Sequence, residues 1–146
     1  MSRLAPVAFA VLVGYATAAP VPKDFKPTDA KLIVGTWHVE EVHYDGVRAT
    51  EYQTNVYFEF DDRGRFAQTM TGESNVFRRT YAIDPTTAPR RMSLVPEGSE
   101  VAQPWVYVLA RDTLVLAYLK DGTVPDAVRP AKGLYVYTLS RVPAGK

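Results

Sequence analysis

The chain has 146 residues, of which 47% are hydrophobic and 23% are charged, a composition typical of one folded domain with an apolar core. Its 17 Lys and Arg residues against 16 Asp and Glu residues give a net charge of +1, which argues against a dedicated nucleic-acid-binding protein. The chain has no cysteine, which excludes disulfides, thiolate metal sites and cysteine nucleophiles.

The first residues have the three-part layout of a secretory signal peptide. Arg3 is the only charged residue of this segment, the run from Leu4 to Val13 is apolar, and Ala16-Thr17-Ala18 is a cleavage site of small residues. The alternative is a transmembrane anchor, but the apolar segment is shorter than the ~20 residues that a membrane span needs. We therefore expect a signal peptide at residues 1–18 and an exported protein, periplasmic or extracellular, with no membrane span in its mature form.

Residues 19–28 are rich in proline and predict an extended leader. Asp29 follows and predicts the cap of a short helical turn that ends at Leu32. Beyond it the hydrophobic pattern has period two, and tight turns such as Asp45-Gly46 separate the apolar runs. This spacing predicts one all-β domain over residues 29–146, an antiparallel barrel or sandwich. The eight expected strands are 36–44, 55–60, 65–70, 76–83, 91–95, 105–109, 113–119 and 134–141.

Alternation along each strand sorts the side chains into two faces. In the first strand Trp37, Val39, Glu41 and His43 share one face, and the large apolar ring of Trp37 is expected inside. The strand 113–119 is apolar on both faces, so its pattern does not orient it. The bulkier sets in two other strands are Phe58 with Phe60, and Phe77 with Arg79, Tyr81 and Ile83.

The segment Gly35-Thr36-Trp37, after a helical turn, resembles the first strand of lipocalin-type barrels. In those proteins an Arg that follows the last strand packs over the Trp, and Arg141 stands in the matching place. The resemblance implies that Gly35, Trp37 and Arg141 close one end of the barrel through a cation–π contact.

More closely, the chain from about Asp29 to Arg141 resembles an uncharacterised family of exported bacterial proteins, the planctomycete lipocalin-like domain. The resemblance implies an up-and-down barrel of about eight strands, of the lipocalin (calycin) type, and no established activity. Lipocalins commonly carry small apolar ligands, which is an analogy at the level of the fold. The matching segments are 32–37, 45–46, 58–64, 80–85, 89, 106–107, 112–114, 129–130 and 139–141.

If Arg79 and Glu41 both point inward, they need to pair or to meet a ligand, because burying an unpaired charge is costly. Arg79, between Phe77 and Tyr81, is placed to hold the carboxylate of a fatty-acid-like ligand. The alternatives are a structural ion pair between Arg79 and Glu41, or a bulge that turns them to solvent. The candidate ligand-binding residues are Glu41, Phe58, Phe60, Phe77, Arg79 and Tyr81.

Signals for catalysis and for metal binding are weak. Gly72-Glu73-Ser74 lacks the second glycine of a nucleophile elbow, and Asp61-Asp62-Arg63-Gly64 lacks the later acids of a calcium loop. The two histidines, His38 and His43, point to opposite faces of one strand unless a bulge intervenes. We therefore expect no catalytic residue, metal or cofactor. Two hypotheses remain: a barrel that binds a small hydrophobic ligand, and a ligand-free packed barrel that serves protein contacts or envelope structure.

Overall fold

The computed structural model describes residues 28–49 and 55–145. The expected signal peptide at 1–18 and the leader at 19–28, apart from Thr28, lie outside the described residues. No helix in the described part of the chain is long and apolar enough to cross a membrane.

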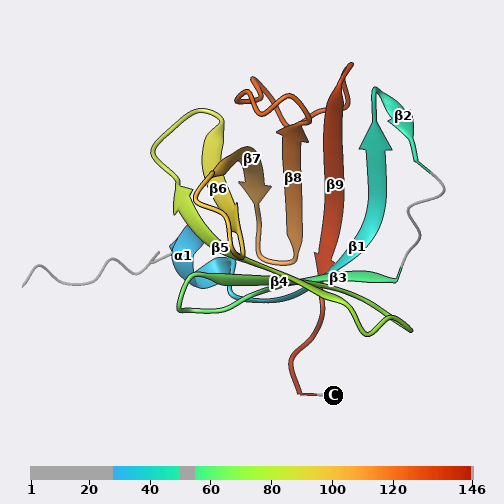
Figure 1. Ribbon diagram of the computed structural model, residues 1–146, viewed down its shortest axis with the longest axis vertical. Coiled ribbons are helices and arrows are strands. Elements are labelled where there is room, and N and C mark those ends of the chain that lie inside the picture. The colour runs from blue at the N-terminus through green and yellow to red at the C-terminus, as the bar shows by residue number, and fades with distance from the viewer. Residues whose placement is uncertain (1–27, 50–54, 146) are drawn as a thin grey trace, which may run out of the picture.

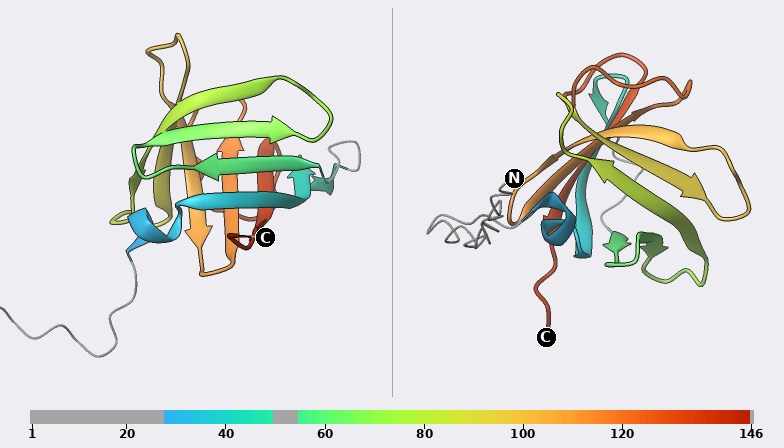
Figure 2. Two further views of the ribbon diagram at one scale, coloured as in Figure 1. Left: turned by 90° about the horizontal axis from the view of Figure 1, so that it is seen from below. Right: turned by 90° about the vertical axis from the view of Figure 1, so that its left-hand side faces the viewer.

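All strand pairs in the described residues are antiparallel, and they form one closed barrel (Figures 1 and 2). Consecutive strands pair from β3 to β9, and β1 pairs with both β3 and β9, which closes the sheet. Eight strands make the barrel and the short β2 is an addition, so the predicted lipocalin-like architecture is confirmed. The elements are α1 (Asp29–Leu32), β1 (Gly35–Tyr44), β2 (Val47–Arg48), β3 (Val56–Phe60), β4 (Arg65–Met70), β5 (Val76–Asp84), β6 (Arg90–Pro96), β7 (Gln103–Leu109), β8 (Thr113–Leu119) and β9 (Leu134–Arg141).

The barrel has two different ends because its strands alternate in direction. We call the end where β1 begins and β9 ends the closed end, since α1 packs against it. Ile33, which follows α1, is fully buried, and its carbonyl oxygen accepts a 2.8 Å hydrogen bond from the indole Nε1 of Trp37. The opposite end, where β1 ends and β9 begins, is called the open end.

Arg141 and Trp37 make the expected contact at the closed end. The guanidinium carbon of Arg141 lies 4.2 Å from the centre of the Trp37 ring, and the two residues are register partners on β9 and β1. The Arg141 guanidinium also donates hydrogen bonds to the carbonyl oxygens of Leu32, Val34 and Arg111. One planar cation therefore ties the first strand, the last strand and the chain after α1 together.

Gly35 is required where it stands. Its φ of +135° lies in the region that favours glycine, and a Cβ there would lie 2.9 Å from Nη1 of Arg141. Any larger residue at position 35 would therefore displace the Arg141 side chain that covers Trp37.

The sequence pattern predicts that Asp29 caps α1, and this prediction was wrong. Thr28 holds the N-cap position, and Oδ2 of Asp29 instead accepts 2.8 Å hydrogen bonds from the Tyr107 hydroxyl and from Nη1 of Arg90. The Arg90 guanidinium also lies over the Tyr107 ring, 5.4 Å from its centre. Burial, followed by the hydrogen bond to Asp29, raises the pKa of Tyr107 far above its usual value. Asp29 therefore anchors α1 to the barrel through a carboxylate.

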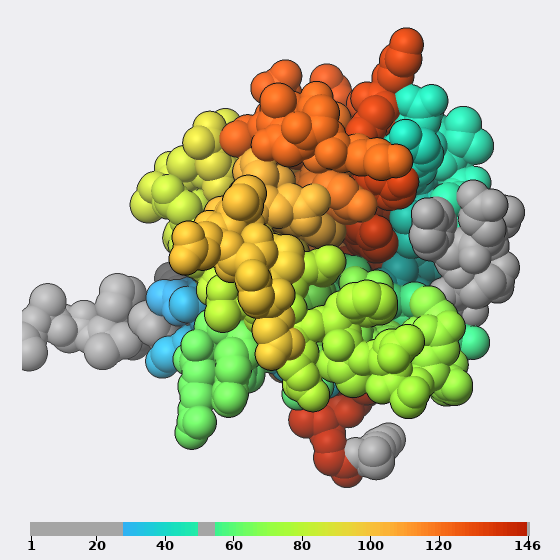
Figure 3. Space-filling model, viewed as in Figure 1, coloured from blue at the N-terminus to red at the C-terminus, as the bar shows by residue number. Residues whose placement is uncertain are grey.

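Both faces of β8 pack against apolar clusters, which explains why its pattern gave no orientation. Leu114 and Leu116 face the barrel interior, while Ala117 belongs to an outer apolar cluster. The irregular segment 120–133 contributes Val128 to this cluster and has Pro125 buried (Figure 3, orange, at the top). The outer cluster contains Val106, Ala117, Leu134 and Val136.

Candidate functional site

A β-bulge in β1 decides where Glu41 points. Val39 pairs with Leu139, but Glu41 pairs with the next residue back, Thr138, so β1 holds one extra residue at this point. Val42 takes the inward position and is buried. Simple alternation, which puts Glu41 and His43 on one face with Trp37 and Val39, was therefore wrong. For Glu41 the structure shows the alternative, a bulge that turns this side chain outward.

Glu41 lies on the outer face in a small ion-pair cluster. Its Oε1 is 3.2 Å from Nε2 of His43 and 3.7 Å from Nε of Arg48. The ion pair between Arg79 and Glu41, one of the alternatives considered for these residues, is therefore absent among the described residues.

The same bulge turns His43 outward, so that His43 and His38 both lie on the outer face, the arrangement for which the sequence requires a bulge. Glu40 accepts hydrogen bonds from His38, at 2.9 Å, and from Ser140. The bond from Ser140, followed by the one from His38, lowers the pKa of Glu40. Among residues 28–49 and 55–145, no three potential metal ligands lie close enough together to hold a metal ion.

Three of the candidate ligand residues belong to the packed interior. Phe58 and Phe60 are buried, and the ring of Phe66 lies 5.1 and 5.0 Å from theirs. Tyr81 packs edge-on against Phe60 at 5.0 Å and donates a 2.6 Å hydrogen bond to the carbonyl oxygen of Asp61. All three face inward, as expected, but their side chains fill the barrel and leave the open end to other residues.

Phe77 and Arg79 lie where β5 enters the barrel at its open end. Phe77 pairs with Gln68 of β4, whereas the pairing of β5 with β6 begins only at Arg79. Phe77 therefore has a strand neighbour on one side only, and 57% of its surface is exposed. Arg79 is half-buried, and its guanidinium carbon lies 5.7 Å from the centre of the Phe66 ring.

Four aromatic side chains form a row on the other wall of the barrel at its open end. They are Tyr44, Tyr135, Tyr118 and Trp105, from β1, β9, β8 and β7, which we call the aromatic row. Successive ring centres in the row are 4.2, 4.9 and 4.3 Å apart. Tyr44 and Tyr118 are both register partners of Tyr135, so strand pairing sets the row.

The aromatic row and Arg79 are connected across the interior. The ring of Tyr137 lies 5.9 Å from that of Trp105 and 5.5 Å from that of Phe58. Phe58 contacts Phe66, over which Arg79 lies. One continuous line of side chains therefore joins a cation on β5 to the aromatic wall opposite.

The accessibility of the aromatic row rises toward the open end. Trp105 is 3% exposed, Tyr118 and Tyr135 are half-buried, and Tyr44 is 36% exposed. Sequence reasoning missed these four residues as site candidates. Their shared signal was position, since each lies within three residues of the strand terminus at the open end.

No protein-family model matches the chain, and no curated protein is significantly similar to it. The open end offers two kinds of interaction, an aromatic wall and a half-buried arginine. Such a combination suits a ligand with an apolar body and an anionic group.

Proposed function

We propose that the protein is an exported lipocalin-like barrel, related to the planctomycete domain family, that binds a small hydrophobic ligand at its open end. The observation that carries the proposal is the aromatic row, whose inward-facing rings become progressively accessible toward that end. At the closed end the inward-facing residues Trp37, Tyr107 and Leu114 are fully buried, so no space for a ligand is expected there.

The ligand that fits this site is amphipathic. Aromatic and acyl groups pack favourably against tyrosine and tryptophan rings, which provide apolar area with few rotatable bonds. Arg79 is held on the Phe66 ring and has no ion-pair partner among the described residues. A carboxylate of a fatty-acid-like ligand would supply that partner.

A second candidate is a ligand-free barrel that contacts another protein. It is favoured by the tight packing of Phe58, Phe60 and Tyr81, which fill the middle of the barrel. Exposed apolar side chains also lie on loops and strands at the open end, where Val101 is 75% and Val47 is 70% exposed. Exposed apolar residues that gather on one surface are typical of protein contacts.

A fluorescence titration with anilinonaphthalene sulfonate, which combines aromatic rings with an anionic group, distinguishes the two candidates. Ligand binding predicts saturable binding that Tyr118→Ala weakens, because this substitution interrupts the aromatic row. Tyr57→Ala is the matched control, since Tyr57 lies on the outer face beside His38. Non-saturable binding, or an equal loss of affinity in Tyr118→Ala and Tyr57→Ala, would exclude a site at the aromatic row and favour the ligand-free barrel.

A further inference from the structure

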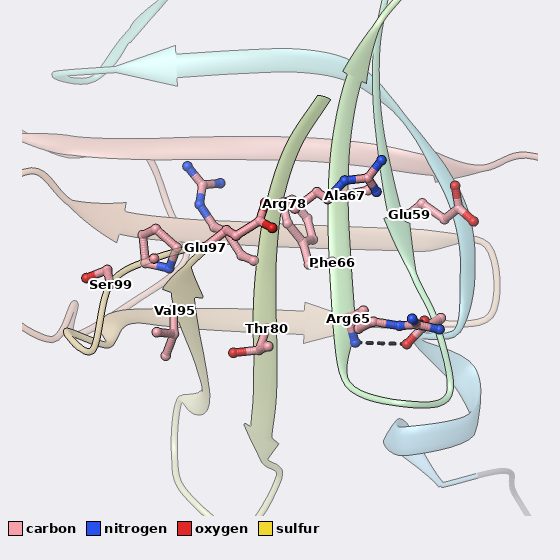
Figure 4. Close-up of a pocket in the computed structure, with 13 residues that line it drawn as sticks. Glu59, Arg65, Phe66, Ala67, Arg78, Thr80, Val95, Glu97 and Ser99 are labelled. Carbon is pink, nitrogen blue, oxygen red and sulfur yellow. Dashed lines mark hydrogen bonds and ion pairs between the residues drawn. The ribbon is translucent and has the colours of Figure 1, made fainter. Parts of the chain in front are cut away.

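A groove of about 530 Å³ lies on the outer face of the barrel, over β3 to β6 (Figure 4). Its volume falls in the range of sites that bind small molecules, about 300–1,000 Å³. The barrel wall separates it from the aromatic row, whose members lie on β1, β7, β8 and β9.

Short side chains form the floor of the groove. Ala67 lies between Glu59 and Arg78 in the cross-strand register, and Thr80 lies next to Val95. Neighbouring strands are about 4.8 Å apart, so the short Ala67 leaves a gap of two strand spacings between its longer neighbours. In Figure 4 the side chain of Arg78 extends over Ala67 toward the strand that carries Glu59.

The turn after β6 forms one wall of the groove. The amide of Glu97 donates a 3.1 Å hydrogen bond to the carbonyl oxygen of Arg78. The amide of Ser99 donates a 3.0 Å hydrogen bond to the carbonyl oxygen of Pro96. These bonds hold the turn beside β5 and place Glu97 next to Arg78 at the groove. The wall is therefore fixed by the backbone.

The groove carries charges of both signs, and three of the charged side chains form no ion pair with any residue that the structure describes. Asp61 and Arg65 neutralise each other, with Oδ2 of Asp61 2.6 Å from Nε of Arg65. Within the described part of the chain, by contrast, the side chains of Glu59, Arg78 and Glu97 form no ion pair. A cation with an acid on either side suits a ligand that itself carries both charges.

We infer that this groove is a second binding site, for an amino acid or short peptide with a free ammonium group and a free carboxylate. Arg78 binds the carboxylate through its planar fork of N–H donors, and Glu97 accepts from the ammonium. Ala67 and Val95 contact a small apolar side chain. A purely anionic ligand fits less well, because Glu59 and Glu97 repel it.

The test is a ¹H–¹⁵N NMR titration of the full chain with alanyl-alanine. The proposal predicts saturable shifts of the Ala67, Thr80, Val95 and Ser99 amides. Arg78→Gln is expected to weaken binding by about tenfold or more, since a charge-assisted hydrogen bond is lost. Arg63→Gln is the matched control, because Arg63 is an exposed arginine of the β3–β4 turn outside the groove. The same spectra show that each variant is folded.

Four results would overturn the proposal. The first is that the groove amides do not shift, and the second is that N-acetyl-alanyl-alanine amide, which has no terminal charges, binds equally well. The third is that Arg63→Gln weakens binding as much as Arg78→Gln. The fourth is that the shifts are confined to Trp105 and Tyr118, which would place the dipeptide inside the barrel. Phe66 and Arg79 border both sites, but none of the four residues of the aromatic row lines the groove. Failure here therefore leaves binding at the aromatic row, which Tyr118→Ala tests, untouched.

Discussion

Arg141 and Trp37 come from the last and first strands of the barrel and lie with guanidinium over indole, 4.2 Å from the guanidinium carbon to the ring centre. They are also register partners, so the contact stands at the seam where β9 meets β1. A barrel exists only if this seam closes, because otherwise both strands present unpaired edges. The stability of the fold should therefore depend strongly on these two residues.

Trp37→Ala is expected to destabilise the protein by ~3–5 kcal/mol, the cost of deleting a buried tryptophan. Trp37 is fully buried, so the substitution leaves a cavity as well as removing the contact with Arg141. Urea unfolding gives the free energy directly. Trp37→Phe retains part of the packing and should cost less, while a loss below about 1 kcal/mol for the alanine variant would contradict a core centred on Trp37.

Arg141→Lys should destabilise the protein by about 1–3 kcal/mol although it keeps the charge. A lysine ammonium does not reproduce the planar arrangement that bonds to Leu32, Val34 and Arg111 while stacking on Trp37. The effect is measured by comparing the melting temperature of this variant with that of Arg129→Lys, a substitution at an exposed position. Equal melting temperatures for the two variants would show that charge alone suffices at position 141.

Arg79→Leu is expected to abolish binding of a fatty acid at the open end while leaving binding of the corresponding neutral alcohol unchanged. The reason is that the Arg79 guanidinium is the half-buried cation connected through Phe66 and Phe58 to the aromatic row. Calorimetric titration with each compound provides the comparison. If Arg79→Leu weakens the binding of both compounds equally, Arg79 stabilises the aromatic side chains of the site and does not bind the carboxylate.

The stability of the protein should fall as the pH rises above about 10, the ordinary pKa of tyrosine. Burial and the hydrogen bond to Asp29 raise the pKa of Tyr107 in the folded state. The unfolded chain therefore loses this proton first, and the stabilisation present below pH 10 is lost as the pH climbs toward the folded-state pKa.

Tyr107→Phe removes this contribution, so its unfolding free energy should depend less steeply on pH in the alkaline range. Tyr57→Phe is the control, with a half-buried ring on the outer face. Identical alkaline slopes for Tyr107→Phe and the unmodified protein would mean that Tyr107 does not ionise in the relevant range.

Much of the fold was predictable because its determinants are local. Period-two alternation and turn residues located eight strands, and the observed bounds differ from the expected ones by at most two residues at either end. The contact of Arg141 with Trp37 followed from the resemblance to lipocalin-type barrels. The short strand β2 was not expected, since only Val47 and Arg48 form it.

The site was less predictable because it depends on strand register. The bulge that turns Glu41 outward appears only in the pairing of β1 with β9, where two residues of β1 oppose one of β9. The aromatic row likewise joins residues distant in sequence, such as Tyr44 and Tyr135, that become neighbours only when the barrel closes. Alternation within a single strand contains neither kind of information.

Ligand binding at the open end is tested most directly by native mass spectrometry of the protein recovered after export, followed by solvent extraction. We expect a chain that begins at Ala19 and carries a defined extra mass, which is lost on denaturation. The Tyr118→Ala variant should carry less of this bound compound than the Tyr57→Ala variant. A bare chain in every preparation, including one incubated with a lipid extract, would contradict ligand binding at the open end.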